Sequence, residues 1–170
     1  MLDKSKLNLY ARRILAQINP EITVTEKVLD CIDMLLTRFI KIMVRRSSNL
    51  VQNVKKHTIT VADLEATVQL EFSDCFAEKL LLDLAASGVE ESQESLIPDT
   101  KIKLKMKKFA RISRISKTAV HFFACVIEVM IKEIMTASVG EMVARNEHEL
   151  QLDHVIHAFH QQKSFMVLLD

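Results

Sequence analysis

The apolar residues of the first half of the chain recur in the second half at a constant offset of 91 positions. The register is kept by pairs such as Leu15 and Met106, Ile18 and Phe109, Val24 and Ile115, Ile32 and Phe123, Met43 and Ile134, Ile59 and Leu150, and Val68 and Phe159. One register that holds across three apolar segments and two intervening loops is difficult to produce by chance. The sequence therefore predicts a structural duplication within one chain.

Composition narrows the class of fold that is duplicated. Only two glycines and two prolines occur among 170 residues, whereas sandwiches, barrels and dinucleotide-binding folds need glycine at turns and phosphate loops. Hydrophobic residues make up 49% of the chain and charged residues 26%, the balance of a globular protein. No apolar run approaches the roughly 18 residues of a membrane span, and Met1–Lys6 lacks a signal-peptide pattern. We therefore expect an all-α protein that does not cross a bilayer.

Apolar spacing predicts the order short helix, long helix, short helix in each repeat. The expected helices are 7–19, 26–53, 61–72 and 74–87 in the first repeat, and 100–110, 116–146 and 153–162 in the second. At 1.5 Å per residue the helix 26–53 would be about 40 Å long, and it must bury its apolar stripe against a partner. Because the same chain supplies that partner, we expect an intramolecular handshake of the two repeats.

Charge and composition divide the chain near its middle. The segment Gly88–Asp99 resembles a linker because it holds one of the two glycines, one of the two prolines and little that could pack. We therefore expect a first domain at 1–89, an acidic linker at 90–99 and a second domain at 100–170.

The net charge of +1 hides a strong segregation of charge. Residues 1–89 hold 12 Lys/Arg and 11 Asp/Glu, and residues 90–99 hold four acids and no base. Residues 100–117 hold eight Lys/Arg and no acid. These lysines could simply form a solvated helix face. Eight bases without an acid in 18 residues nevertheless favour the binding of an anion.

Several stretches resemble histones. Ile14–Pro20 is similar to the end of the first helix of histone 2B, and Lys55–Thr60 to its basic second loop and the strand that follows. In the second repeat, Arg114–Ser116 resembles the arginine-containing first loop of histones, and Ala119–Glu128 resembles the start of the long helix of histone 2A. A 2B-type repeat fused ahead of a 2A-type repeat resembles the histone doublets of marseillevirus-type giant viruses, in a short form.

The resemblance implies two histone folds in one chain that form a handshake pseudo-heterodimer. It implies a structural protein rather than an enzyme, with no cofactor, no metal and no small-molecule substrate. Its partners would be double-stranded DNA, bound without sequence specificity, and a doublet of the histone 4 and 3 types, with which it would build nucleosome-like particles. The expected location is the virion and either the viral factory or the host nucleus.

In a handshake, the second loop of one repeat lies beside the first loop of the other. Lysine, arginine and hydroxyl side chains, together with helix N-terminal amides, then form a phosphate-binding surface that needs no base contacts. The candidate DNA-binding residues are Arg12, Arg13, Lys27, Lys55, Lys56, Thr58, Lys105, Lys107, Lys108, Arg111, Arg114, Ser116 and Lys117.

The two ends of the handshake are expected to bind DNA unequally. One loop pair combines Lys55–Thr58 with the basic segment 111–117, whereas the other sets Lys27 and Arg145 against three acids. Of the glutamates expected from the acidic patch of histone 2A, Glu128 and Glu133 remain.

Apolar residues near the end of the first repeat exceed what the intramolecular core needs. By resemblance, Leu70, Phe72 and Phe76 would contact the histone 4-type part of a partner doublet. This surface is our candidate partner interface.

Histidine and cysteine patterns do not indicate chemistry. His154, His157 and His160 recur at every third residue, but beyond Asp153 no ligand pair accompanies them at metal-binding spacing. A helix-surface or partner-facing stripe is therefore favoured over a metal site. No nucleophile–base set, phosphate loop or carboxylate pair appears, so we expect no enzyme.

Three cysteines, Cys31, Cys75 and Cys125, fall among apolar residues, which favours buried thiols in a reducing, intracellular compartment.

A second hypothesis comes from the regulatory class of histone-fold proteins. A transcription or replication subunit could use the same platform mainly to bind proteins. The near-neutral charge and the acidic linker favour this alternative, whereas the Lys55–Thr58 loop and Arg114 favour DNA packaging.

Overall fold

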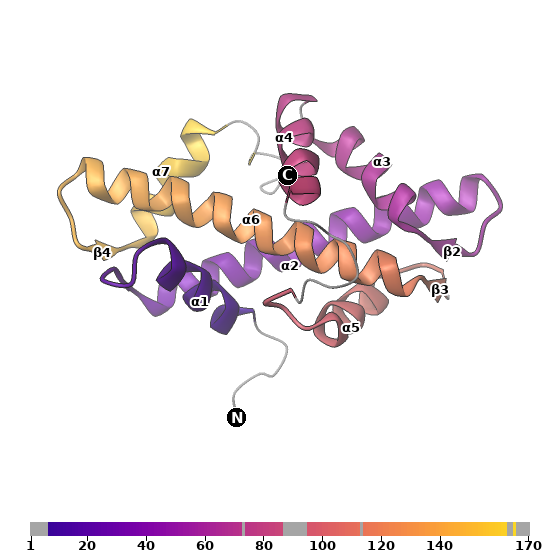
Figure 1. The fold of residues 1–170 in the computed structure, drawn as a ribbon, viewed down its shortest axis with the longest axis horizontal. Coiled ribbons are helices and arrows are strands. Elements are labelled where there is room, and N and C mark those ends of the chain that lie inside the picture. The colour runs from indigo at the N-terminus through magenta and orange to yellow at the C-terminus, as the bar shows by residue number, and fades with distance from the viewer. Residues whose placement is uncertain (1–6, 73, 87–94, 113, 163–164, 166–170) are drawn as a thin grey trace. The chain divides into compact units, whose positions relative to one another are not determined.

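A computed structural model of the chain describes residues 7–72, 74–86, 95–112, 114–162 and 165. Over these residues the chain is helical, with four strands of two residues each (Figure 1). The first repeat contains α1 (Asn8–Ile18), β1 (Thr23–Val24), α2 (Glu26–Asn53), β2 (Thr58–Ile59), α3 (Val61–Glu71) and α4 (Asp74–Ala86). The second contains α5 (Asp99–Phe109), β3 (Arg114–Ile115), α6 (Lys117–Ala144), β4 (Glu149–Leu150) and α7 (Leu152–Gln161). None of the described helices is long and apolar enough to cross a membrane.

The internal duplication is confirmed element by element. Helices α5 and α6 begin and end 91 residues after α1 and α2, and strands β3 and β4 lie 91 residues after β1 and β2. The register extends to the backbone, because Lys55 and Asn146 have φ angles of 57° and 56° at corresponding positions after the long helices. Asn146 also explains why α6 ends at Ala144 rather than at 146, since a left-handed residue there terminates a helix.

The described elements form two compact units, and each unit contains parts of both repeats. Unit 1 consists of residues 1–36 and 130–170, and unit 2 of residues 37–129. In unit 1, β1 pairs in parallel with β4, and in unit 2, β2 pairs in parallel with β3 (Figure 1). In both units a strand that follows one long helix pairs with a strand that precedes the other. This is the loop pairing that a handshake of the two repeats predicts.

Cleaving the chain within residues 88–94, between α4 and α5, should leave the two halves associated. Each unit is built from both halves, so separation would expose the apolar core of both units. A protease site introduced there, followed by size-exclusion chromatography, measures the result. Halves that elute separately and remain helical would contradict the handshake.

The core of unit 2 is centred on aromatic rings. The ring centroid of Phe39 lies 5.8 Å from that of Phe72 and 5.9 Å from that of Phe123, and Phe72 lies 5.0 Å from Phe76. Phe72 and Phe76 are 5% and 9% exposed, whereas Leu70 is 70% exposed. The expectation that these two rings are surplus to the core is therefore wrong, and a partner contact through Leu70 stays a prediction.

The end of the expected linker is packed against α6. The Glu128 carboxylate accepts hydrogen bonds from the Ser95 hydroxyl and the Leu96 N–H, both at 3.1 Å. Ile97 is fully buried. The prediction that this segment holds little that could pack is thus wrong for residues 95–98, and residues 87–94 lie outside the described part of the chain. Glu128, expected as part of an acidic patch, is hydrogen-bonded within its own chain.

Candidate nucleic-acid interface

A parallel strand pair fixes the position of the predicted phosphate-binding residues in unit 2. Thr58 is the register partner of Arg114, and Ile59 is the partner of Ile115. The Ser116 N–H extends the ladder by donating to the Ile59 carbonyl at 3.0 Å. We call residues 54–60 with 110–117 the cationic loop pair, because this sequence holds five Lys/Arg and no Asp or Glu.

The five cations of this loop pair are Lys55, Lys56, Arg111, Arg114 and Lys117, and all are exposed. Among the described residues, none of the five forms an ion pair. An open hollow of about 560 Å³ lies at this place, and it is lined by Gln52, Lys55, Lys56, His57, Arg111 and Ile112. Exposed, unpaired cations around a shallow hollow can meet an anion without first losing a carboxylate partner.

The backbone at the end of α2 presents the two lysines. The Lys56 N–H donates to the Val51 carbonyl at 2.9 Å, and Lys55 occupies the left-handed region. A non-glycine residue costs roughly 1 to 2 kcal/mol in this conformation. The turn ends α2, and the two lysines lie between this helix and β2.

Unit 1 contains the same backbone arrangement with opposite charge. Thr23 pairs with Glu149, and the Thr25 N–H donates to the Leu150 carbonyl at 3.3 Å, as Ser116 does to Ile59 in unit 2. We call residues 19–26 with 145–151 the acidic loop pair, because it holds four glutamates and one arginine. The backbone hydrogen bonds of the two loop pairs correspond. The difference in charge between them therefore comes from their side chains.

The charge is inverted at corresponding positions. Glu147 stands where the cationic loop pair has Lys56, and Glu149 stands where it has Thr58. On the opposite strand, Thr23 replaces the arginine that pairs with Thr58. Glu147 also lies 3.2 Å from the buried His154 Nε2, so its carboxylate has a structural partner.

The remaining predicted DNA contacts are distributed unevenly. Arg12 forms an ion pair with Glu26, and the Lys105 ammonium donates to the Thr37 hydroxyl at 3.3 Å, so both cations have partners within the chain. Arg13 and Lys27 are exposed and belong to unit 1.

The end of α5 extends the cationic loop pair. Lys107 and Lys108 are exposed and lie in the last turn of α5, shortly before residues 110–117 in unit 2. The Ser116 hydroxyl accepts the Ala119 N–H at 3.1 Å, so it caps α6 as well as lying in the loop.

Sequence reasoning left two side chains of this site without a role. Gln52 and His57 line the hollow beside the lysines. His57 lies within the basic loop of Lys55–Thr60, so its place beside the lysines could have been predicted from the sequence. Gln52 lies on a helix face whose direction becomes known only from the packing.

Comparisons with known proteins place this arrangement in a fold. No protein-family model matches the sequence, and no curated protein matches it. Among solved structures, the chain is similar to the crystal structure of the histone from Methanopyrus kandleri, with a TM-score of 0.65 and 17% sequence identity. The match covers 91% of this chain and 93% of that one.

The chain has the histone fold. Because the match covers nearly all of both chains, one chain of the Methanopyrus kandleri histone corresponds to both repeats of this chain. The two chains are therefore similar over both repeats, and not over a single histone fold. This similarity explains why each loop pair combines a strand from each repeat.

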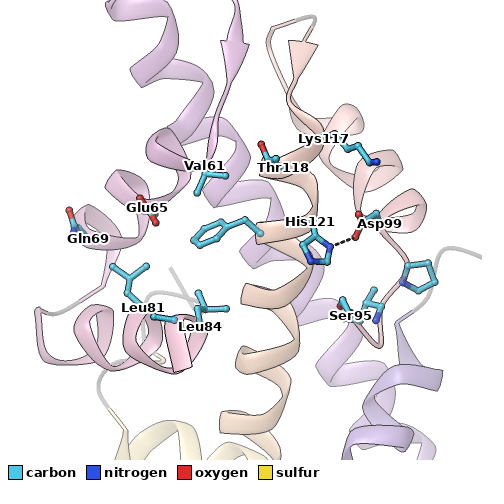
Figure 2. A pocket seen from close by; sticks show the side chains of 14 residues that line it. Val61, Glu65, Gln69, Leu81, Leu84, Ser95, Asp99, Lys117, Thr118 and His121 are labelled. Atoms are coloured by element: carbon cyan, nitrogen blue, oxygen red, sulfur yellow. Dashed lines mark hydrogen bonds and ion pairs between the residues drawn. The ribbon is translucent and has the colours of Figure 1, made fainter. Parts of the chain in front are cut away.

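The histone fold of this chain also contains a larger pocket in unit 2, of about 1080 Å³ (Figure 2). Its walls include Val61, Glu65 and Gln69 of α3, Leu81 and Leu84 of α4, Ser95 in the segment before α5, Asp99 at the start of α5, and Lys117, Thr118 and His121 of α6. His121 Nδ1 lies 3.2 Å from the Asp99 carboxylate. A dashed line marks this contact in Figure 2. One turn along α6, the Cys125 sulfur lies 4.0 Å from His121 Nε2.

This cysteine and histidine do not form an activated nucleophile. Burial, with the nearby negative charges of Glu128 and Asp99, raises the pKa of Cys125 to about 11. A thiol with this pKa is protonated at neutral pH, whereas nucleophilic catalysis requires a thiolate. Cys31 and Cys125 are half-buried rather than fully buried, which corrects the expectation for these two, and the side chain of Cys75 lies outside the described residues.

Cys125 should react slowly with iodoacetamide in the folded chain. Because its pKa is raised, its thiolate fraction at pH 8 should be lower than that of an ordinary cysteine, by a factor of about 100. The labelling rate should rise about tenfold per pH unit up to about pH 11. Peptide-resolved mass spectrometry measures this rate, with the chain unfolded in urea as the control. Equal rates at pH 8 in the folded and unfolded chain would contradict the assignment.

The histidines of α7 do not form one stripe. His154 is 1% exposed, and its Nδ1 accepts the Gln151 N–H at 3.0 Å, whereas His160 is exposed. His157 Nδ1 lies 2.6 Å from the Glu141 carboxylate. The prediction of a surface stripe is therefore wrong for His154, which caps its own helix. Among the described residues no group of three or more His, Cys, Asp or Glu could hold a metal ion.

Proposed function

We propose that this chain is a DNA-packaging histone doublet that holds the phosphate backbone through its cationic loop pair. The observation that carries the proposal is the contrast between two loop pairs with corresponding backbone hydrogen bonds. One has five exposed cations without ion pairs among the described residues, and the other has four glutamates. The protein is structural rather than enzymatic on this proposal.

The chemistry of the loop pair supports binding without sequence specificity. Lys55, Lys56, Arg111 and Arg114 lie on loops and two-residue strands, and their cationic side chains can contact phosphate oxygens, which carry no sequence information. Lys107 and Lys108 add charge at the end of α5. Contacts of this kind hold the DNA backbone, and their strength depends on salt.

The proposed partner is a doublet of the histone 4 and 3 types, with which the chain would form nucleosome-like particles. The resemblance of its repeats to histones 2B and 2A supports this partner. The exposed Leu70, at the end of α3, is the apolar residue we assign to the contact. The proposed location is the virion and either the viral factory or the host nucleus.

Binding to a DNA duplex of random sequence at graded salt tests the function. If all five cations of the loop pair contact phosphate, the slope of log K against log salt should be about −4 to −5. The affinity should not depend on base sequence. Absence of salt-dependent binding, with the chain folded by circular dichroism, would overturn the proposal.

A protein-binding platform is the second candidate function. Two observations favour it: the net charge is only +1, and Leu70 and Leu82 are both exposed by more than two thirds in unit 2. Reconstitution with a histone 4/3-type doublet and DNA, followed by nuclease digestion, separates the candidates. A protected DNA fragment supports packaging, whereas protein association without protection supports the platform.

A further inference from the structure

Two side chains of α2 hold the backbone of Arg111. The Arg111 N–H donates to the Ser48 hydroxyl at 3.3 Å, and the Gln52 side-chain amide donates to the Arg111 carbonyl at 3.5 Å. Ser48 is fully buried, and its own hydroxyl proton goes to the Val44 carbonyl at 2.7 Å. Ser48 and Gln52 are one helical turn apart, so they face the same loop. Both polar groups of one exposed loop residue are thus satisfied by α2.

In the acidic loop pair the corresponding residues cannot form these hydrogen bonds. The positions corresponding to Ser48 and Gln52 are Val139 and Val143, and the position corresponding to Arg111 is Pro20. Proline has no N–H to donate, and valine has no group to accept or donate a hydrogen bond. The helix side chains and the loop residue therefore differ together between the two loop pairs.

We infer that Ser48 and Gln52 are positioning residues for Arg111 in DNA binding, an inference that rests on the proposed function. Arg111 lines the hollow with Lys55 and Lys56, which follow the last turn of α2. Hydrogen bonds from that same helix set the distance between the loop of Arg111 and the two lysines. Without them the guanidinium would remain on the surface, but its place beside the lysines would no longer be fixed.

Ser47 supplies a matched control. It is also fully buried, one residue away on the same helix, but its hydroxyl lies 2.8 Å from the Thr67 hydroxyl of α3 and not beside Arg111. Ser47→Ala and Ser48→Ala each remove one buried hydroxyl from unit 2, so their effects on the core should be similar. Only Ser48→Ala takes away the acceptor of the Arg111 N–H.

The experiment measures amide exchange and DNA binding in the full chain. Ser48→Ala should accelerate hydrogen exchange at the Arg111 amide about tenfold or more, and it should lower the salt slope of DNA binding by up to about 0.9, the share of one phosphate contact. Ser47→Ala should leave both quantities unchanged, even where it lowers the melting temperature. In an Arg111→Ala background, Ser48→Ala should cause no further loss of DNA affinity, because its effect passes through the guanidinium.

The possible failures are distinguishable. An additive loss in the double variant, or an unchanged slope for Ser48→Ala, would overturn the positioning role while leaving DNA binding by the wild-type chain intact. Equal changes of the salt slope for Ser47→Ala and Ser48→Ala would assign the effect to core stability and overturn the inference as well. A wild-type chain that does not bind DNA would overturn the proposed function itself.

Discussion

Replacing Lys55, Lys56 and Arg114 together with alanine is expected to lower the salt slope of DNA binding by roughly 2 to 3 units. The three cations are exposed, belong to the cationic loop pair and have no ion-pair partner among the described residues. Each cation that neutralises a phosphate releases about 0.9 counterions from the DNA, so its removal lowers the slope by that amount. Titration of a labelled duplex at several salt concentrations measures the slope.

The acidic loop pair provides the control for this variant. Arg145→Ala in this loop pair, combined with Lys27→Ala directly after it, should change the slope little, because four glutamates already oppose phosphate there. Glu149→Lys is the sharper reciprocal test, since Glu149 is exposed and its change should add up to about one unit of slope. Glu147→Lys is less suitable because it would also remove the partner of the buried His154. Equal losses from the two alanine sets would contradict an asymmetric interface.

Phe72→Glu is expected to unfold unit 2, with a loss of more than about 4 kcal/mol in the free energy of unfolding. The ring is 5% exposed and packs between Phe39 and Phe76, so the variant removes two aromatic contacts and buries a carboxylate. This differs from the expectation formed on the sequence, in which the ring contacts a partner. Urea denaturation followed by circular dichroism measures the change.

Leu70→Glu is the matched variant, two residues away on the same segment. Its side chain is 70% exposed, so the free energy of unfolding should change by no more than about 0.5 kcal/mol. If the histone 4/3-type doublet contacts this surface, Leu70→Glu should prevent co-assembly while the chain stays folded. A stable, folded Phe72→Glu variant would contradict the core assignment.

The features that could be predicted from sequence are those that repeat. Helix α2 spans Glu26–Asn53, the range that the apolar stripe predicts. A long amphipathic helix has an apolar residue at every third or fourth position on its buried face, so its extent can be read from the sequence. The offset of 91 residues then places the second repeat without further information. The pairing of Thr58 with Arg114 follows once two such repeats bury each other head to tail.

The features that could not be predicted depend on contacts between distant residues. Phe72 and Leu70 are both apolar, and the sequence pattern at the end of α3 does not show which of them faces Phe39. The burial of His154 depends on Glu147 in the preceding loop, and the packing of Ile97 depends on Glu128, which holds the segment before it. The bond from Arg111 to Ser48 joins residues 63 positions apart. The periodicity of a single helix cannot predict a hydrogen bond between residues so far apart in the sequence.

The division of the chain into two interleaved units also sets an order for folding during synthesis. Unit 2 is one continuous stretch, so it is complete once residue 129 has left the ribosome. Unit 1 begins with residues 1–36 but needs residues 130–170, so its N-terminal helix must wait while all of unit 2 is made. At about 5 to 20 residues per second this delay lasts at least several seconds, far longer than a helix takes to form. During that interval α1 can contact the start of α2, with which Leu7, Asn8 and Arg12 interact in the folded chain, but residues 130–170 of unit 1 are not yet made. The apolar surface that those residues cover is then open to chaperones and to aggregation.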